Sequence, residues 1–301
     1  MLVLHIGYAK TGTTSLQKHF FPKLENVIYL GRTYPVPEIV TGSFLNKLMG
    51  LFNKMEFDNL AETLQYYIHD DSEKLREYAQ QFKYAVQKLP IEKIKVFSHE
   101  NLLRPSSFER TAERIHELFQ DMEVKIVFTI RRQQELIMSR LNHNKAFFDL
   151  NHNDLKLHFS ESMQNCIFPI CNKLSDKRCH KTCAGRKKIS LDYYDFNKVI
   201  SAFEDVFGKD CVEVFYFEKI FKSDSEHTNR LAKLLNSDDK TISDLIRDIP
   251  HTNMAKDPEN YLQFKAKFKE QCSDYLFDYY RESNAKLSAR HNLRLEDAGY
   301  C

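Results

Sequence analysis

The sequence predicts an α/β fold in three layers, with a central, mainly parallel sheet and helices on both faces. Two observations predict it. Five short segments rich in Val, Ile and Phe are continuously apolar, as strands are when both faces of their sheet are covered. Segments with apolar residues at helical spacing lie between them, and this alternation is typical of strand–helix–strand units in one open sheet.

Each expected strand is bounded by polar residues or by a helical pattern. The strands are Leu2–Ile6, Val27–Leu30, Ile94–Phe97, Lys125–Ile130 and Val212–Phe217. The expected helices are Thr14–Phe21, Leu60–Gln87, Ser107–Phe119, Gln133–Ala146 and Ser225–Leu235. A last long helix is expected to begin at Asp257-Pro258-Glu259, because proline is favoured in the first turn.

Length and composition fit one domain with a large core. The chain has 301 residues with only 8 Gly and 8 Pro, which argues against collagen-like, linker-rich and disordered chains. We expect a single domain over residues 1–301, with the irregular segment at about 147–190 as an insertion or lid. The net charge of +2 argues against a whole-surface polyanion binder. No apolar run approaches the roughly 18 residues of a membrane span, and Met1 leads into the first strand without a signal-like segment, so we expect a cytoplasmic protein.

A loop with two glycines, one lysine and three threonines follows the first expected strand and leads into a helix. It reads Gly7-Tyr8-Ala9-Lys10-Thr11-Gly12-Thr13-Thr14. The glycines let the backbone turn so that several N–H groups point into one concavity. The start of the helix adds unpaired N–H groups and the positive end of its dipole, and the lysine and hydroxyls add charge and further donors. The loop therefore predicts an anion site.

The position of the lysine separates this loop from the ATP-binding loop G-x-x-x-x-G-K-[ST]. Both glycines and the final hydroxyl match, but Thr13 occupies the lysine position and Lys10 lies inside the loop. In this respect the loop resembles the 5′-phosphosulfate loop of the sulfotransferases that use 3′-phosphoadenylyl sulfate (PAPS). The family pattern K-x-G-T-[ST]-x-L stands here as Lys10-Thr11-Gly12-Thr13-Thr14-Ser15-Leu16. A plain helix N-cap with a run of threonines is the alternative.

The resemblance implies a second cationic site, because PAPS carries another phosphate on its 3′ position. In the family, the first Arg and the final Ser of R-[ND]-P-x-x-R-x-x-S hold this phosphate. Here Arg131 and Ser139 have that spacing after the expected strand Lys125–Ile130, at the edge where open α/β sheets bind ligands. Three positions depart from the pattern, namely Arg132, Gln133 and Leu136. An arginine pair capping a sheet edge, with a solvated helical serine, is the alternative.

A candidate base follows the expected strand Ile94–Phe97. Sulfuryl transfer needs a group in the cleft that takes the proton of the acceptor hydroxyl. Sulfotransferases use His or Glu for this, and many bacterial members carry S-x-E-N-L, which Ser98-His99-Glu100-Asn101-Leu102 resembles. Neighbouring side chains of a continuing strand point to opposite faces, so we favour Glu100 as the base and place His99 second. A polar turn is the alternative.

Two weaker similarities extend the likeness over most of the chain. Val212–Ile220 resembles the late strand and turn of these enzymes, and Tyr280–Leu287 resembles the C-terminal helix of bacterial members. The resemblance is to the bacterial, carbohydrate-directed type, and implies a P-loop-like three-layer sandwich. It further implies PAPS as donor, 3′,5′-adenosine bisphosphate (PAP) as product, a sugar or glycoconjugate as acceptor, and no catalytic metal, nucleic acid or membrane span.

Four cysteines cluster in the irregular segment, at Cys166, Cys171, Cys179 and Cys183. Their spacing is compatible with a structural zinc site, although the C-x2-C pair is absent. Disulfides and incidental thiols are the alternatives. The overlapping stretch Asn172–Lys188 holds seven Lys and Arg against one acid, Asp176. This suits an anionic acceptor, and a solvated surface run is the plainer interpretation.

Two other functions compete with sulfuryl transfer. A P-loop nucleotide kinase with an atypical loop predicts Mg-dependent ATP binding and indifference to a 3′-phosphate. A zinc-stapled module that binds nucleic acid through Lys173–Lys188 predicts salt-sensitive affinity that survives loss of Lys10. The displaced lysine weighs against the first, and the near-neutral total charge against the second.

Overall fold

The computed structural model describes residues 1–31, 64, 67, 73–103, 107–143, 159–160, 189–222, 224–250 and 258–301. The chain divides into two compact units. The first contains Met1–Arg104, Phe108–Ile130 and Phe203–Thr252, and the second contains Pro105–Ser107, Arg131–Ala202 and Asn253–Cys301. The expectation of one domain over residues 1–301 stays a prediction, and of its proposed lid at about 147–190 only residues 159–160 and 189–190 are described.

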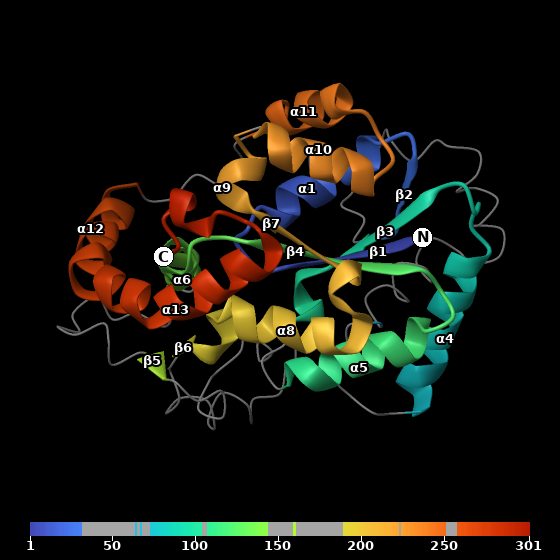
Figure 1. Ribbon diagram of the computed structural model, residues 1–301, viewed down its shortest axis with the longest axis horizontal. Coiled ribbons are helices and arrows are strands. Elements are labelled where there is room, and N and C mark those ends of the chain that lie inside the picture. The colour runs from blue at the N-terminus through green and yellow to red at the C-terminus, as the bar shows by residue number, and fades with distance from the viewer. Residues whose placement is uncertain are drawn as a thin grey trace. The chain divides into compact units, whose positions relative to one another are not determined.

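The first unit is built on a five-stranded sheet, shown in Figure 1. The strands are β1(Leu2–Gly7), β2(Val27–Tyr29), β3(Ile94–Ser98), β4(Val124–Ile130) and β7(Val212–Tyr216). Their order is β2-β3-β1-β4-β7, and all four neighbouring pairs are parallel. The five expected strands and the parallel sheet are therefore confirmed.

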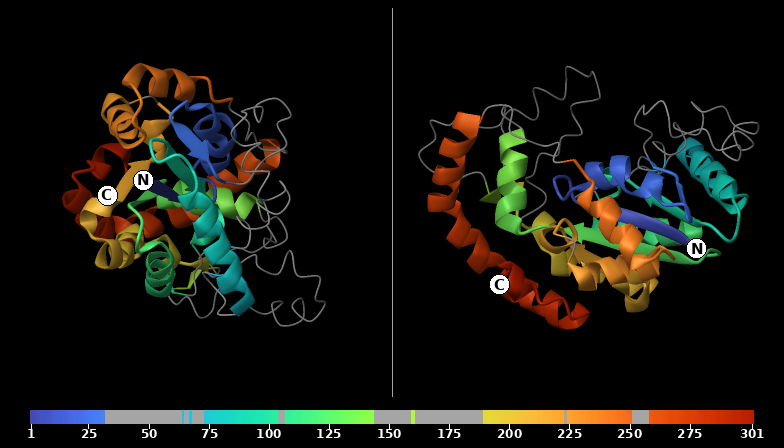
Figure 2. Two further views of the ribbon diagram at one scale, coloured as in Figure 1. Left: turned by 90° about the vertical axis from the view of Figure 1, so that its right-hand side faces the viewer. Right: turned by 90° about the horizontal axis from the view of Figure 1, so that it is seen from above.

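Helices cover both faces of this sheet (Figures 1 and 2). On one face lie α1(Thr13–His19), α10(Ser225–Leu234) and α11(Asp239–Arg247), and on the other lie α4(Glu73–Gln87) and α5(Phe108–Phe119). Short turns complete the unit: η1(Phe21–Lys23), η2(Glu100–Leu102), η8(Lys209–Cys211) and α9(Phe217–Ile220). The three-layer α/β fold is thus confirmed.

Each face of the sheet has its own apolar core. On the first face, Val3 and Val127 of the sheet pack with Leu16 of α1, Leu231 of α10 and Ile242 of α11. On the second face, edge-to-face aromatic contacts join the sheet to its helices at Phe82–Phe97 and Phe128–Phe203, and Phe82–Phe119 joins α4 to α5. Strands buried on both faces explain why the apolar segments of the sequence are continuous.

The second unit is mainly helical. It contains α6(Gln133–His143), α12(Pro258–Phe268), a π-helical turn η9(Lys269–Ser273), α13(Asp274–His291), the turns η7(Asp192–Tyr194) and η10(Leu295–Ala298), and a short parallel pair of strands, β5(Phe159–Ser160) and β6(Ile189–Ser190). The segment from α12 through η9 to α13 continues as one bent helical rod (Figure 2). A buried amide pair joins α6 to α13, because Gln133 and Asn284 each donate to the other's side-chain oxygen, at 2.8 and 3.1 Å.

The helices expected from the sequence are confirmed wherever the chain is described, and the start of α12 at Pro258 matches the expected helix start. Residues 60–63, 65–66, 68–72 and 144–146 of two expected helices lie outside the described residues. The expectations missed α8(Phe196–Phe207), α9 and α11. None of the helices in the described part of the chain is long and apolar enough to cross a membrane.

Candidate functional site

The strand order reverses next to β1, so that later strands are added on both sides of it. After β1 the chain continues to β2 on one side of it, and after β4 it continues to β7 on the other side. Open α/β sheets bind ligands outside the carboxyl ends of their strands at such a switch point. The loop of residues 8–12, which we call the phosphate loop, leaves β1 at this place.

The backbone of the phosphate loop alternates in handedness. Lys10 has φ +77° and Gly12 has φ +82°, whereas Thr11 between them does not have a positive φ. A left-handed backbone is uncommon for a residue with a side chain such as Lys10. Alternation of this kind turns successive N–H groups to one side and forms a concavity for an anion.

The threonine hydroxyls hold the loop together from inside. The hydroxyls of Thr11 and Thr13 donate to the carbonyl oxygen of Tyr8 at 2.7 and 3.2 Å, and the N–H of Thr11 donates to the same oxygen at 3.2 Å. Thr11 and Thr13 are buried. Both hydroxyls and the N–H of Thr11 are therefore engaged within the loop. For contact with an anion, these two residues offer the N–H of Thr13, in the first turn of α1.

Both glycines of the loop are required by close neighbours. A Cβ at Gly7 would lie 2.5 Å from Oγ1 of Thr13, and a Cβ at Gly12 would lie 2.4 Å from the ring of Phe221. Gly12 is also the N-cap of α1, which has seven residues. Because this helix is short, the case for an anion site depends on the loop backbone and on Lys10 more than on a helix dipole.

Of the other predicted loop ligands, Thr14 and Ser15 lie in the first turn of α1 and Lys10 lies in the phosphate loop. Thr14 and Lys10 are half-buried, and Ser15 is buried with 9% of its surface exposed. The predicted loop residues thus form one continuous turn from β1 into α1, as the sequence pattern indicated.

A buried histidine lies beneath the loop. Nδ1 of His5 is 2.7 Å from Oγ of Ser98 on β3, and Nε2 is 2.8 Å from Oγ1 of Thr129 on β4. Gln17 of α1 donates from Nε2 to the same serine hydroxyl at 3.1 Å and to the Ser98 carbonyl at 3.0 Å. Burial lowers the pKa of His5 to about 3, so the imidazole is neutral at pH 7.

The two candidate bases differ in exposure. His99 is buried with 5% of its surface exposed, its ring stacks on Phe97 at 6.1 Å, and its N–H donates to the carbonyl of His5 at 3.3 Å. Glu100 begins η2 and is half-buried. Glu100 is therefore the more accessible of the two predicted bases.

The predicted 3′-phosphate residues both lie in the second unit, Arg131 just before α6 and Ser139 within it. Nη2 of Arg131 is 3.6 Å from Oε2 of Glu135, four residues on. Ser139 follows Glu135 by another four residues in α6, and residues at this spacing share a helix face. Nη2 of Arg132 is 4.0 Å from Oε1 of Glu135. Arg131 therefore precedes α6 and contacts Glu135, and Glu135 and Ser139 lie one helical turn apart within α6, all in the second unit.

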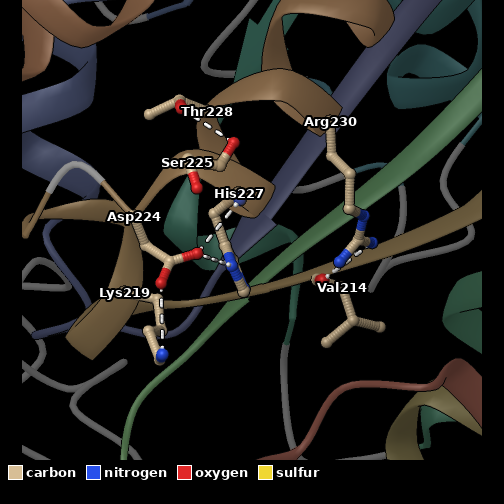
Figure 3. Close-up of polar contacts among 7 residues, drawn as sticks. All are labelled: Val214, Lys219, Asp224, Ser225, His227, Thr228 and Arg230. Atoms are coloured by element: carbon tan, nitrogen blue, oxygen red, sulfur yellow. Dashed lines mark hydrogen bonds and ion pairs between the residues drawn. The ribbon is translucent and has the colours of Figure 1, made fainter.

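A second charged cluster lies where α9 leads into α10 (Figure 3). Asp224 caps α10 by accepting from the N–H of His227 at 3.4 Å, and its carboxylate also contacts Nδ1 of His227 at 3.3 Å and Nζ of Lys219 at 3.1 Å. Burial works to raise the pKa of Asp224, and hydrogen bonds from Lys219 and His227 outweigh it, so this pKa lies below its ordinary value. Burial lowers the pKa of His227 against the opposing effect of Asp224.

Among the described residues, no group of three or more His, Cys, Asp and Glu side chains is arranged to hold a metal ion. The four cysteines that suggested zinc, Cys166, Cys171, Cys179 and Cys183, lie outside the described residues, as does the basic segment Asn172–Lys188. Cys211, Cys272 and Cys301 are described as free thiols. Zinc at the cluster stays a prediction.

Comparison with known proteins finds no matching family model and no matching curated protein. Among solved structures, the chain is similar to a sulfotransferase from Alicyclobacillus acidocaldarius, with 16% identity, 96% of this chain and 95% of that chain covered, and a TM-score of 0.48. It is similar to the mouse sulfotransferase SULT7A1 complexed with PAP, with 12% identity, 99% of this chain and 86% of that chain covered, and a TM-score of 0.44. It is also similar to retinol dehydratase in complex with androsterone and the inactive cofactor PAP, with 14% identity, 97% of this chain and 82% of that chain covered, and a TM-score of 0.37. At TM-scores below 0.5 these likenesses do not by themselves establish fold or function.

Sequence reasoning missed the residues that support the loop. His5, Gln17 and Thr129 were not singled out, because nothing local in the sequence reports a hydrogen bond between residues 81 to 124 positions apart. The one available signal is a histidine inside an otherwise apolar strand, which requires a polar partner once it is buried. Phe221, which packs on Gly12, carries no such signal.

Proposed function

We propose that the chain is a PAPS-dependent sulfotransferase that moves a sulfuryl group from PAPS to a hydroxyl of a carbohydrate or glycoconjugate. One observation carries the proposal. The phosphate loop leaves β1 at the switch point of a parallel sheet with Lys10 in a left-handed conformation inside the turn, and a threonine in place of the lysine of ATP-binding loops.

In this proposal the phosphate loop binds the 5′-phosphosulfate. The N–H groups of residues 12–14 and the ammonium of Lys10 face the bridging region between phosphorus and sulfur. When the sulfur–oxygen bond breaks, negative charge grows on the leaving 5′-phosphate of PAP. Fixed N–H donors and a cation placed at that charge stabilise the transition state more than the ground state.

Arg131 and Ser139 are proposed to bind the 3′-phosphate. Arginine suits this task because its planar group donates two parallel hydrogen bonds to phosphate. Its guanidinium is paired with the Glu135 carboxylate at 3.6 Å. In this proposal, binding of the phosphate exchanges one anionic partner of Arg131 for another, and Ser139 adds a hydroxyl donor from α6.

Glu100 is proposed as the base. The acceptor oxygen attacks sulfur, the bond between sulfur and the 5′-phosphate oxygen breaks, and the acceptor proton passes to the Glu100 carboxylate. The products are a sulfate ester and PAP. His99 is the second candidate, and its burial against Phe97 is the reason that we place it behind Glu100.

The carbohydrate acceptor rests on the motif resemblance alone. Transfer of radiolabelled sulfate from PAPS to a panel of glycans, steroids and phenols tests it. Labelling of glycans is the expected result, and labelling of steroids or phenols only would replace this acceptor class while leaving sulfuryl transfer in place.

Calorimetry on the full chain tests the donor. PAP is expected to bind at least about tenfold more tightly than 5′-AMP or Mg-ATP, since a second charged anchor contributes on the order of a charged hydrogen bond. Arg131→Ala is expected to bring PAP down to the affinity of 5′-AMP without changing that of 5′-AMP. Equal affinity of the wild-type chain for all three nucleotides would contradict the proposal and favour a nucleotide kinase.

Loss of the loop lysine is expected to have the largest effect on transfer. Lys10→Ala should lower kcat by about 10²–10³-fold, the usual cost of removing one transition-state donor. Lys23→Ala is the matched control, because this lysine is exposed just beyond α1 and should transfer normally. Near-normal turnover in Lys10→Ala would remove the lysine from the mechanism.

A further inference from the structure

A buried chain of hydrogen bonds crosses three strands directly beneath the phosphate loop. It runs from Gln17 on α1 to Ser98 on β3, then to His5 on β1 and on to Thr129 on β4, over 3.1, 2.7 and 2.8 Å. All four residues are buried, with between 0% and 5% of their surface exposed. We call these residues the His5 chain.

The donation by Gln17 favours one direction for the His5 chain. Gln17 donates to the hydroxyl oxygen of Ser98, which leaves the Ser98 proton available for Nδ1 of His5. When Nδ1 accepts that proton, Nε2 of the neutral ring carries the ring proton and donates to Thr129. In this tautomer every link points from α1 towards β4.

Each strand in this chain leads within one or two residues to a segment of the proposed site. His5 is two residues before Gly7, where the phosphate loop begins, and a Cβ added there would lie 3.2 Å from Cε1 of His5. Ser98 directly precedes His99, and Thr129 is two residues before Arg131. The backbone follows the same route, since the N–H of His99 donates to the carbonyl of His5.

We propose that His5 is a positioning residue, which holds the ends of β1, β3 and β4 in the register that the proposed donor and base segments need. This inference rests on the proposed function. The sheet itself is already joined by backbone hydrogen bonds, and an apolar side chain in this place would avoid the cost of burying an imidazole. The His5 chain adds hydrogen bonds that fix a specific geometry at the edge where the phosphate loop leaves the sheet.

Ligand binding by two matched variants tests the inference. His5→Phe removes both ring hydrogen bonds, and Val3→Ala removes core contacts two residues earlier on the same face of β1, where Val3 is 1% exposed. Both are compared at a temperature where each is fully folded. His5→Phe is expected to weaken PAP binding at least about tenfold, as lost buried hydrogen bonds do, and Val3→Ala to stay within about threefold. Equal losses in the two variants would mean that His5 acts only through stability.

Hydrogen exchange of the ligand-free proteins separates this inference from the proposed function. In His5→Phe the amides of residues 10–13 and 99–100 are expected to exchange faster than in Val3→Ala, while the amides of α10 and α11 stay alike in both. If the wild-type chain fails to bind PAP, the proposed function is wrong and the exchange pattern alone decides the role of His5. Uniform exchange changes in both variants would overturn the inference.

Single-link variants provide the same test if His5→Phe does not fold. Thr129→Val removes the last hydrogen bond at nearly constant volume, and Ser98→Ala removes the first two. Each is expected to weaken PAP binding by a smaller factor than His5→Phe. Long-range ¹H–¹⁵N spectra of the wild-type chain should show a His5 ring protonated on Nε2 with no titration between pH 5 and 8, and a ring protonated on Nδ1 would contradict the direction of the chain.

Discussion

His5 and His227, two of the buried histidines of the first unit, are held in very different ways. His5 and His227 are 1% and 2% exposed, and burial lowers the pKa of each. Both nitrogens of His5 bond to side chains on neighbouring strands, 93 and 124 residues away. His227 has one ring hydrogen bond, to Asp224 three residues earlier, and its ring meets that of Tyr216 edge-on at 4.3 Å.

The hydrogen bond of His227 is local in the sequence, whereas those of His5 are long-range. The Asp224–His227 contact belongs to the cap of α10 and is made within one helical turn (Figure 3). The His5 chain can form only when α1, β1, β3 and β4 are assembled. A buried histidine with a lowered pKa is therefore not by itself a sign of function, and what matters is which segments its hydrogen bonds join.

The largest effect that would sharpen this comparison is the dependence of stability on pH. The folded pKa of His5 is about 3 and the unfolded value is near 6.5, so its contribution is complete above pH 6.5 and is lost as the pH falls towards 3. The full change is on the order of 5 kcal/mol, of which about 2 kcal/mol falls between pH 7 and pH 5. The free energy of unfolding of wild type minus that of His5→Gln, measured with urea, should fall by about 2 kcal/mol between pH 7 and pH 5.

A difference that stays constant with pH would mean that His5 titrates alike in the folded and unfolded chains. His227→Gln serves as the comparison, since its histidine shifts in the same direction but keeps part of its contact with a carboxylate. Its pH dependence is expected to be the weaker of the two, because Asp224 offsets part of the cost of a charged ring.

The second prediction concerns the contact between the end of α9, which leads to His227, and the phosphate loop above His5. Phe221, at the end of α9, packs its ring against Gly12 of the phosphate loop. Gly12→Ala puts a side chain at φ +82° and a Cβ 2.4 Å from that ring, and is expected to cost about 2–4 kcal/mol from left-handed backbone and overpacking together. Thermal and urea unfolding measure the loss.

Gly299→Ala is the matched control for this substitution. Gly299 has φ +75°, and the nearest atom to an added Cβ lies at 3.6 Å, so only the backbone cost of about 1 kcal/mol is expected. Measured in a Phe221→Ala background, Gly12→Ala should cost no more than Gly299→Ala does in the wild type. Equal costs at the two glycines would show that the ring moves aside freely and that α9 does not fix the loop.

These tests also separate what the sequence could predict from what it could not. The five strands follow from continuous apolar segments, and the phosphate loop from two glycines and Lys10 at a fixed spacing, because both signals are local. Helix α11 was missed although Asp238 caps it and accepts from the N–H of Thr241 at 2.8 Å, a signal that the sequence does contain. The His5 chain could not be predicted, since its partners come together only through the strand order.

The predicted roles of Thr11 and Thr13 show a further limit. A hydroxyl in a glycine-rich loop suggests a donor for an anion, but both hydroxyls donate to the carbonyl of Tyr8 instead. The residue type indicates that hydrogen bonds will form, and only the fold determines whether a ligand or the backbone receives them.

The smallest expected effect tests the local side of the comparison. Asp224→Ala removes the cap of α10 and the carboxylate that contacts Nδ1 of the buried His227, and should lower the free energy of unfolding by about 1–2 kcal/mol. Asp238→Ala removes the cap of α11, which has no buried histidine behind it, and is expected to cost less. PAP affinity should be unchanged in both variants, because neither cap joins the strands from which the proposed site is built. If Asp224→Ala weakened PAP binding as much as His5→Phe, the effect would have to reach the phosphate loop through α9 and Phe221, and the distinction between a local and a long-range histidine would fail.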